Sequence, residues 1–510
     1  MLNMGDDTSS QVSSIYKKLS HTEHVLQLPD TYVGSIERHT ESIYVLCDDK
    51  IQKKQISYVP ALYKIIDEIL VNSIDQHVRM REAKSSDPVT QIKVNINNET
   101  GEIQIYNNGE GIDVVFMDEH QCYVPELIFG NLLTSTNYDT NSEKIVGGKN
   151  GYGAKLANIF STQFYIETID SKLKKKYTQE FRSNMTEKKK PKITKSSNKP
   201  HTLFRFIPDY KRFGMEGLDD DIISLIGKRV YDICACTDKS VSVFLNDKKL
   251  DVKTFEKYVD LYIGQKADKA RVFITPNERW EVVATSSNDD IFEQVSFVNG
   301  INTIRGGKHV DYISDQIRDK VVEMFKKKKK MEIKGNIVKN QLMLFVKSTI
   351  VNPSFDSQTK ETLTTAKKGF GSDCKLENSF MDKLWKTDFI EKILNQSEFK
   401  NSKQLKKTDG KKQRNILGVP KLCDANRAGT KDSKKCTLIL TEGDSAKSMA
   451  IAGLSVVGRD HYGVFPLKGK VLNVKDADVE KITKNDEINH LKTIIGLKNG
   501  EKYDENSLNN

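Results

Sequence analysis

The chain has 510 residues, which predicts about three folding units at roughly 100–200 residues per domain. Hydrophobic residues make up 37% and charged residues 29%, proportions typical of a globular protein rather than a disordered one. The 80 basic against 70 acidic residues give a net charge of +10, a mild excess that bears on partners rather than on fold. The net charge alone does not decide whether the protein has a polyanionic partner.

Targeting and membrane signals are missing from the sequence. No apolar run approaches the roughly 18 residues that span a bilayer, and the first residues lack the apolar core of a secretory signal. The seven cysteines are scattered and show no Cys-x-x-Cys spacing. We therefore expect free thiols in a reducing compartment and no membrane partner.

The first half of the chain alternates helical and strand patterns. Residues 1–40 read as a polar extension with short elements, and 60–79 have helical spacing of apolar residues behind a first-turn proline. VTQIKVNIN and GEIQIYNNG alternate as a hairpin does, and a helix is expected after the glycine-rich segment 147–153. The lysine-rich passages 172–176 and 187–199 are expected to be solvated hairpin loops.

A second region begins near residue 250. FEQVSFVNGINTIRGGKHVDYISDQI predicts a strand, a glycine turn and a helix, and NQLMLFVKSTI predicts a further strand. High charge density at 403–414 favours an exposed connection. After it, KKCTLILTEGDSAKSMAIAG predicts a buried strand, an acidic turn and a helix, which open a third, α/β unit.

The helix at 60–79 carries the first chemical signal. Glu68, Asn72 and Asp75 lie at i, i+4 and i+7 and so share one face, although this spacing also fits a plain solvent face. Two glycine-rich segments follow, at 107–111 behind a strand and at 147–155 before a helix. Glycines let the backbone approach a ligand, and N–H groups at a helix N-terminus suit a polyphosphate. Their order and spacing together predict a nucleotide site.

These segments carry a family resemblance. DEILVNSID, NNGEGI, LLTSTNYD and GGKNGYGAK resemble the ATP-binding motifs of the superfamily of gyrases, heat-shock chaperones, histidine kinases and mismatch-repair proteins. Within it, NYD followed by GGKNGYGAKLANIFST closely resembles the eukaryotic type II (type IIA) DNA topoisomerases. The resemblance runs from about Tyr16 to the last residues.

The resemblance implies an α/β fold throughout. It consists of a GHKL (Bergerat) ATPase sandwich, a smaller left-handed βαβ transducer and a partial Toprim unit. The implied boundaries are a strap at 1–40, the ATPase domain at 41–249, the transducer at 250–412, and a linker with the partial Toprim unit at 413–510.

The same resemblance assigns roles in the site. Glu68 would be the general base, Asn72 would hold Mg²⁺, and Asn107 would contact adenine. For Asp75, a nucleotide contact and a buried structural acid both remain open. The remaining expected nucleotide contacts are Tyr16, Ser135, Thr136, Asn137, Gly148, Lys149, Asn150, Gly151, Tyr152, Gly153, Ala154 and Lys155.

Two segments bear on dimerisation and switching. Residues 15–18 resemble a swapped strap whose Tyr16 would reach the partner's nucleotide, the alternative being a disordered tail. Leu28 departs from the basic residue that the family often has before Pro-Asp. NPSFDSQTK resembles the loop with the switch lysine, which makes Lys360 a γ-phosphate contact with Gln358 beside it. A lysine from a second domain would let ATP discriminate between two domain arrangements.

A run of lysines is a candidate DNA contact. Such a run is usually a solvated face, but this one lies where related enzymes place a basic loop in the cavity that admits DNA. Contacts with phosphates alone would give sequence-independent, salt-dependent binding to double-stranded DNA. The residues are Lys326, Lys327, Lys328, Lys329 and Lys330.

The segment 441–447, TEGDSAK, resembles the Toprim motif, in which Glu442 would bind a catalytic divalent ion. By local physics alone, the acidic turn could instead cap a helix through Asp444 or Ser445. Two-metal phosphoryl chemistry needs further carboxylates. Neither those carboxylates nor the cleavage tyrosine is found in these 510 residues, so we expect no DNA cutting by this polypeptide.

The leading prediction is therefore a homodimeric, ATP- and Mg²⁺-dependent clamp that captures a DNA duplex for strand passage. The resemblance implies residence in the nucleus, with the cytoplasm or a viral factory as alternatives. Another GHKL ATPase of the chaperone or mismatch-repair type is a rival that the 250–412 region disfavours. An idle DNA-binding scaffold is a second rival, disfavoured by the presence of Glu68, Asn72 and Lys360.

Overall fold

The computed structural model describes residues 18–132, 134, 143–148, 151–406, 408–409, 419–475, 477–504 and 507. Its contacts divide the chain into two compact units, Met1–Ile390 and Glu391–Asn510. In the described residues, the first unit contains two larger sheets with their helices and two separate two-stranded hairpins. In the part of the chain that the structure describes, no helix is both long and apolar enough to cross a bilayer.

The first sheet of unit 1 is mixed. Its strand order is β10-β8-β7-β11-β4-β3-β12-β13, with β9 on β8. The predicted hairpin is confirmed as antiparallel β3 and β4, while β12 runs parallel to β3. The strands are β3 (Gln91–Ile96), β4 (Ile103–Asn108), β7 (Ser161–Asp170), β8 (Lys175–Arg182), β9 (Glu187–Lys188), β10 (Lys192–Lys195), β11 (His201–Pro208), β12 (Ser242–Leu245) and β13 (Lys248–Lys249).

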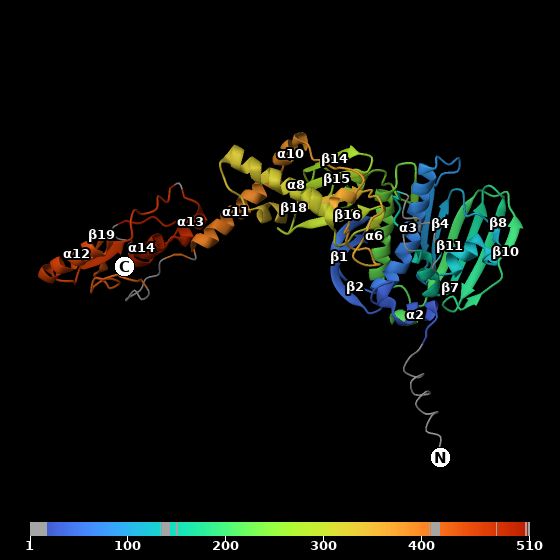
Figure 1. Cartoon of the computed structure of the whole chain (residues 1–510), viewed down its shortest axis with the longest axis horizontal. Coiled ribbons are helices and arrows are strands. Elements are labelled where there is room, and N and C mark those ends of the chain that lie inside the picture. Colours follow the sequence, from blue (N-terminus) through green and yellow to red (C-terminus); the bar gives the residue numbers. More distant parts are fainter. Residues whose placement is uncertain are drawn as a thin grey trace, which may run out of the picture. The chain divides into compact units, whose positions relative to one another are not determined.

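Two hairpins lie outside this sheet, and helices cover it. Helices α3 and α6 lie side by side against the sheet (Figure 1). The hairpins are β1 (His39–Cys47) with β2 (Lys50–Tyr58) and β5 (Phe116–Met117) with β6 (Cys122–Tyr123). The helices are α2 (His21–Gln27), η1 (Pro29–Thr31), α3 (Pro60–Glu82), α4 (Val124–Gly130), α5 (Gly153–Ile159), η2 (Tyr210–Phe213) and α6 (Asp220–Cys236).

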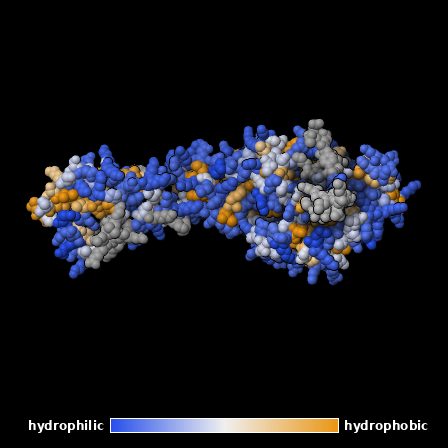
Figure 2. All heavy atoms as spheres, turned by 60° about the horizontal axis from the view of Figure 1, so that its bottom comes forward, coloured by the Kyte–Doolittle hydropathy of each residue, from blue (hydrophilic) through white to orange (hydrophobic). Residues whose placement is uncertain are grey.

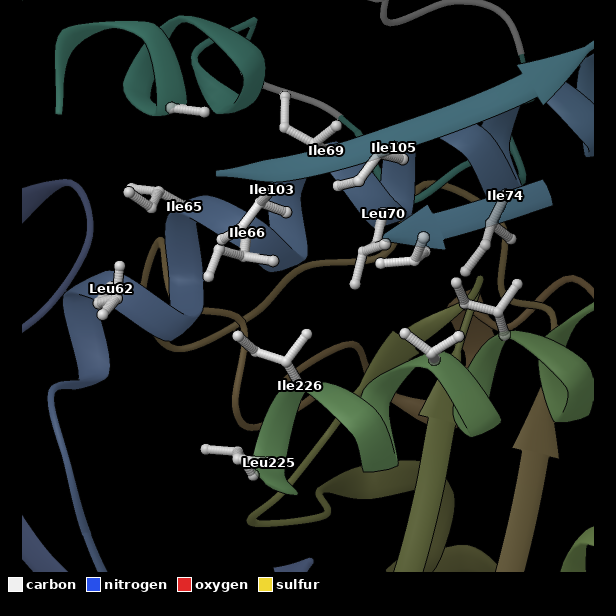
Figure 3. Close-up of a cluster of buried hydrophobic side chains, with 14 of the residues drawn as sticks. Leu62, Ile65, Ile66, Ile69, Leu70, Ile74, Ile103, Ile105, Leu225 and Ile226 are labelled. Carbon is white, nitrogen blue, oxygen red and sulfur yellow. The ribbon is translucent and has the colours of Figure 1, made fainter. Parts of the chain in front are cut away.

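Helix α3 is the centre of this core and confirms the helix predicted from apolar spacing. Pro60 occupies its first turn, where the missing N–H is not needed. Its apolar side chains point toward both β4 and α6, so the helix is covered on two sides (Figure 3). Buried residues drawn there include Leu62, Ile66, Ile69, Leu70 and Ile74 of α3, Ile103 and Ile105 of β4, and Ile226 of α6.

The lysine-rich passages are only partly loops, which corrects the sequence-based expectation. Lys175 and Lys176 begin β8, and residues 187–188 and 192–195 form β9 and β10 beside it. Lysines suit this end of the sheet, because charged side chains on an edge strand oppose pairing with another chain. The alternating pattern of residues 192–195 (KITK) therefore indicated a strand despite its two lysines.

The second sheet of unit 1 has the order β14-β15-β18-β16-β17. Strand β16 runs parallel to β18, and the connection between them passes through α8, which confirms the predicted βαβ crossover. The strands are β14 (Arg271–Asn277), β15 (Trp280–Ser286), β16 (Glu293–Val298), β17 (Ile301–Asn302) and β18 (Leu342–Ser348). The helices are α7 (Phe255–Ile263), α8 (Lys308–Met324), the π-helical turn η3 (Phe325–Lys329), α9 (Gly335–Asn340), η4 (Lys367–Gly369), α10 (Asn378–Trp385) and α11 (Asp388–Lys406), which runs into unit 2.

Unit 2 contains a parallel pair of strands joined by a helix. The predicted strand, turn and helix at 434–453 are confirmed as β19 and α12, and β20 pairs parallel to β19. The elements are η5 (Ser433–Lys435), β19 (Thr437–Glu442), α12 (Gly443–Val457), β20 (Tyr462–Leu467), α13 (Val479–Lys484) and α14 (Asp486–Ile495).

Two expectations for this segment are wrong. β19 is not buried: Leu440 is 46% exposed, because β20 is the strand that pairs with β19 in the described residues. Neither Asp444 nor Ser445 caps α12, since Glu442 is the N-cap residue and Asp444 forms an ion pair with Lys421. Apolar side chains are exposed where α12 lies, Val456 at 86% among them, on a surface that is otherwise mostly hydrophilic (Figure 2).

Candidate active site

A cavity of about 360 Å³ in unit 1 collects most of the predicted site residues. Helix α3, the end of β4, the glycine-rich segment before α5 and the loop at 358–360 all contribute side chains or backbone to its wall. The predicted residues that line it are Glu68, Asn72, Asn107, Gly148, Gly151, Tyr152, Gly153, Ala154, Lys155, Gln358 and Lys360. Glu68 and Lys360, 292 positions apart in sequence, thus meet at one place, as the family resemblance implied.

Six predicted contacts lie outside the described residues and remain predictions. They are Tyr16, Ser135, Thr136, Asn137, Lys149 and Asn150.

Glu68 lies in the cavity wall between two cations. Its side chain is 4% exposed, and its Oε1 atom accepts from Lys64 Nζ at 2.8 Å and from Lys360 Nζ at 3.2 Å. Burial alone would raise the pKa of Glu68, but the charges of Lys360 and Lys64 outweigh it and hold the pKa below its usual value. The carboxylate is therefore ionised at neutral pH and can accept a proton.

Lys360 comes from a loop that is attached to the second sheet region. The backbone of Leu363 exchanges hydrogen bonds with Gly306 and Lys308 near the start of α8, at 3.0 Å each. Lys360 itself has a positive φ of 63°, and its ammonium group reaches α3. Lys360 thus connects the second sheet region to the carboxylate of Glu68 on α3, in the first sheet region.

Asp75 holds the start of the glycine-rich segment. Its two carboxylate oxygens accept the backbone N–H groups of Gly147 at 2.7 Å and Gly148 at 2.8 Å. Burial raises the pKa of this carboxyl group. The structure thus supports a structural acid, although Asp75 also lines the cavity.

Lys155 closes the other end of the same segment. Its ammonium group is buried and donates to the carbonyl oxygens of Thr134 at 2.6 Å and Gly151 at 2.5 Å. Burial lowers the pKa of Lys155 to about 8. A bound anion would favour its charged form, so the side chain suits a phosphate group.

Gly153 leaves room for Glu68. A Cβ atom at this position would lie 2.2 Å from Glu68 Oε2. We expect Gly153→Ala to displace the carboxylate and reduce ATP turnover roughly 5- to 150-fold, since overpacking costs about 1–3 kcal/mol and one tenfold step corresponds to about 1.4 kcal/mol. Gly217→Ala is the matched control, because a Cβ atom there meets nothing within 4 Å. Steady-state turnover of both variants checks this, and equal rates would contradict it.

Part of the cavity lining is apolar and includes one polar pair, Asn107 and Thr202. Asn107 is buried at the end of β4, and Thr202 of β11 lies directly opposite it in the sheet register. Gly111, with φ 76°, passes so close to the Ile169 carbonyl that a Cβ atom would lie 2.0 Å from its oxygen. The apolar wall consists of Ile112, Ile128, Phe129 and Phe204. Apolar side chains beside two polar ones suit a nucleobase.

Several lining residues escaped the sequence-based prediction. Gln76 and Arg79 continue the face of α3 that carries Glu68, so their helical spacing could have identified them. Thr202 had no such signal, because only the pairing of β11 with β4 places it beside Asn107. Lys172, from the β7–β8 turn, pairs with Glu110 at 3.8 Å and Asp113 at 3.6 Å at the cavity rim.

A Mg²⁺ ion would need few protein ligands at this site. Within the described residues, no group of three or more His, Cys, Asp or Glu side chains could hold a metal. Mg²⁺ keeps several waters and binds substrate phosphates, so it needs few protein ligands. Asn72 lines the cavity one helical turn after Glu68 and offers an amide oxygen, a donor that suits a hard cation.

The other predicted functional residues lie elsewhere. Lys326 to Lys329 lie in the π-helical turn η3 and Lys330 follows it; all five are exposed, and Phe325 anchors the turn against Trp385 with ring centroids 4.8 Å apart. Glu442 is exposed at the end of β19 in unit 2.

The sequence matches two family profiles. Residues 58–206 match the family described as histidine kinase-, DNA gyrase B- and HSP90-like ATPase, and residues 243–413 match the DNA gyrase B family. DNA topoisomerase 2 of Pisum sativum is 48% identical over 98% of this chain, and that of Arabidopsis thaliana is 49% identical over 97%. The chain spans 34% of the length of each of these relatives.

Solved structures agree with these relatives. The ATPase region of Saccharomyces cerevisiae topoisomerase II is 42% identical with a TM-score of 0.70, over 75% of this chain and 99% of that one. The ATPase and transducer domains of Balamuthia mandrillaris DNA topoisomerase II are 41% identical with a TM-score of 0.71, over 76% and 98%. These matches disfavour a chaperone or a mismatch-repair ATPase, and this chain belongs to the family of eukaryotic type II DNA topoisomerases.

Proposed function

We propose that this chain binds and hydrolyses ATP and acts as the N-terminal gate of a type IIA DNA topoisomerase. The observation that carries the proposal is the contact of Lys360 with Glu68 inside the cavity. The ammonium group of Lys360, from the second sheet region, contacts the ionised carboxylate of Glu68, from the first sheet region. A ligand that engages both residues would therefore favour one arrangement of the two regions.

In the proposed reaction, the chain's own groups bind the nucleotide and move one proton. Asn107 and Thr202 receive the base, and the backbone of residues 151–155 surrounds the phosphates. A terminal phosphate draws Lys360 away from Glu68, which frees the carboxylate to accept a proton from the attacking water. Asn72 would hold Mg²⁺, which supplies positive charge at the phosphate oxygens.

Phosphate release by the purified chain tests the proposal. We expect steady ATP turnover that requires Mg²⁺ and stops when a chelator is added. ATP binding without turnover would contradict the hydrolysis claim and favour an idle scaffold instead.

Dimer formation and localisation belong to the same proposal. The strap at 15–18 would contribute Tyr16 to the partner's nucleotide, so ATP would close a gate between two copies. Glu442 would bind a divalent ion for DNA cleavage in a longer protein. The plant, insect and fungal relatives support residence in the nucleus.

We also propose that the five lysines at 326–330 contact the DNA backbone. Replacing all five with glutamine should flatten the salt dependence of duplex binding, by roughly 0.9 in the log–log slope for each lysine on a phosphate. Fluorescence anisotropy with a labelled duplex at several salt concentrations measures that slope. The control replaces five exposed lysines at the edge of the first sheet, and equal slopes in both variants would contradict the assignment. Those residues are Lys189, Lys190, Lys192, Lys195 and Lys199.

A further inference from the structure

The ion pairs around Glu68 continue deeper into unit 1. Lys64 Nζ is shared between Glu68 Oε1 at 2.8 Å and Asp67 Oδ2 at 3.3 Å. The other oxygen of Asp67 accepts from Arg229 Nε of α6 at 2.6 Å. None of these four side chains is more than 6% exposed. We call Arg229, Asp67, Lys64 and Glu68 the buried relay.

The far end of the relay reaches the second sheet. Arg229 Nη2 donates at 2.7 Å to the carbonyl oxygen of Gly300, in the turn between β16 and β17. This turn is tightly placed, because Gly300 has φ 79° and a Cβ atom there would lie 2.8 Å from Ile74 of α3. A single guanidinium group therefore connects the second sheet to α3, the helix that carries Glu68.

Charge alternates along the relay, so its members hold one another in place. Each carboxylate lies between two cations: Asp67 between Arg229 and Lys64, and Glu68 between Lys64 and Lys360. A buried charge that loses its partner is strongly destabilised. A displacement of Arg229 would therefore draw Lys64 toward Asp67 and away from Glu68.

We propose that Arg229 is a positioning residue that couples the β16–β17 turn to Glu68 through Asp67 and Lys64. The second sheet then influences the candidate base by a route that is separate from Lys360. This inference rests on the proposed ATP hydrolysis, in which Glu68 is the base.

The protonation of the relay carboxylates is consistent with this coupling. Burial opposes ionisation of Asp67, but Arg229 and Lys64 hold its pKa at about 2. The groups that act on Glu68 are Lys360 and Lys64, which favour its charged form, and Asp67, which opposes it. Without Arg229, Asp67 would compete with Glu68 for the charge of Lys64. The pKa of Glu68 would then rise.

The test compares Arg229→Met, Arg229→Lys and Asp67→Asn in the full chain. We expect Arg229→Met to lower kcat roughly 10- to 100-fold, the scale of a catalytic group misplaced by about 1 Å, with KM changed less than about twofold. The acid limb of its kcat–pH profile should move to higher pH. Asp67→Asn, which preserves shape, should lower kcat similarly, and Arg229→Lys should recover part of it.

Arg271→Met is the matched control. Arg271 is also buried, pairs with Asp260 and donates to the carbonyl oxygen of Gly264 at 2.7 Å, but it lies in the second sheet. The inference is overturned if Arg271→Met lowers kcat equally, or if Arg229→Met and Asp67→Asn leave kcat and the pH profile unchanged. If the inference fails in this way but wild-type protein turns over ATP and Glu68→Gln abolishes that turnover, the proposed function still stands. An inactive wild-type protein overturns both the inference and the proposed function.

Discussion

Replacing Glu68 with glutamine is expected to lower kcat for ATP hydrolysis by roughly 10²- to 10⁴-fold, the range for loss of a general base. Glutamine keeps the shape of the side chain but cannot take the proton from water. Because the cavity wall is otherwise unchanged, the affinity for a non-hydrolysable ATP analogue should stay within about threefold. Steady-state phosphate release and analogue binding measure the two quantities.

Glu82→Gln provides the control for this variant. Glu82 lies on the same helix but is exposed at its end, away from the cavity. Its replacement should leave kcat unchanged. If Glu68→Gln turns over ATP as fast as Glu82→Gln, the assignment of the base is wrong.

Replacing Lys360 with methionine is the second change with a large expected effect. A hydrogen bond to a charged group contributes about 1.5–3 kcal/mol, which corresponds to roughly 10- to 150-fold in kcat/KM for ATP. ADP lacks the γ-phosphate, so its affinity should change less than about twofold. Calorimetry with ADP, beside turnover of ATP, separates the two effects.

Lys347→Met is the matched control for Lys360. Lys347 lies on β18 of the second sheet and pairs with Glu281 at 2.8 Å, outside the cavity. We expect its ATP turnover to remain at the wild-type level. A loss of ADP affinity equal to the loss of ATP affinity in Lys360→Met would contradict the γ-phosphate assignment.

Local patterns predicted the elements and the motifs of the site. The 3.6-residue spacing identified α3 and placed Glu68 and Asn72 on one face, and alternation identified the β3–β4 hairpin. The family resemblance then added Lys360, which local spacing alone would have left as an ordinary loop residue. The cavity contains all three residues.

Contacts between distant segments could not be predicted in this way. Arg229 and Asp67 read as charges on two amphipathic helices, and nothing local indicates that they pair across 162 positions. Thr202 depends on the register of β11 against β4. The sequence did not predict the exposure of β19, because an apolar run does not reveal how many strands pair with it or what packs on it. Such features depend on tertiary pairing rather than on periodicity.

The dependence of ATP turnover on protein concentration tests the gate most directly. If ATP closes a gate between two copies, turnover per chain should rise with concentration and then level off as dimers form. The same curve for Glu68→Gln should stay near zero throughout. Turnover per chain that is constant from the lowest to the highest concentration would contradict the account, because each chain would then hydrolyse ATP alone.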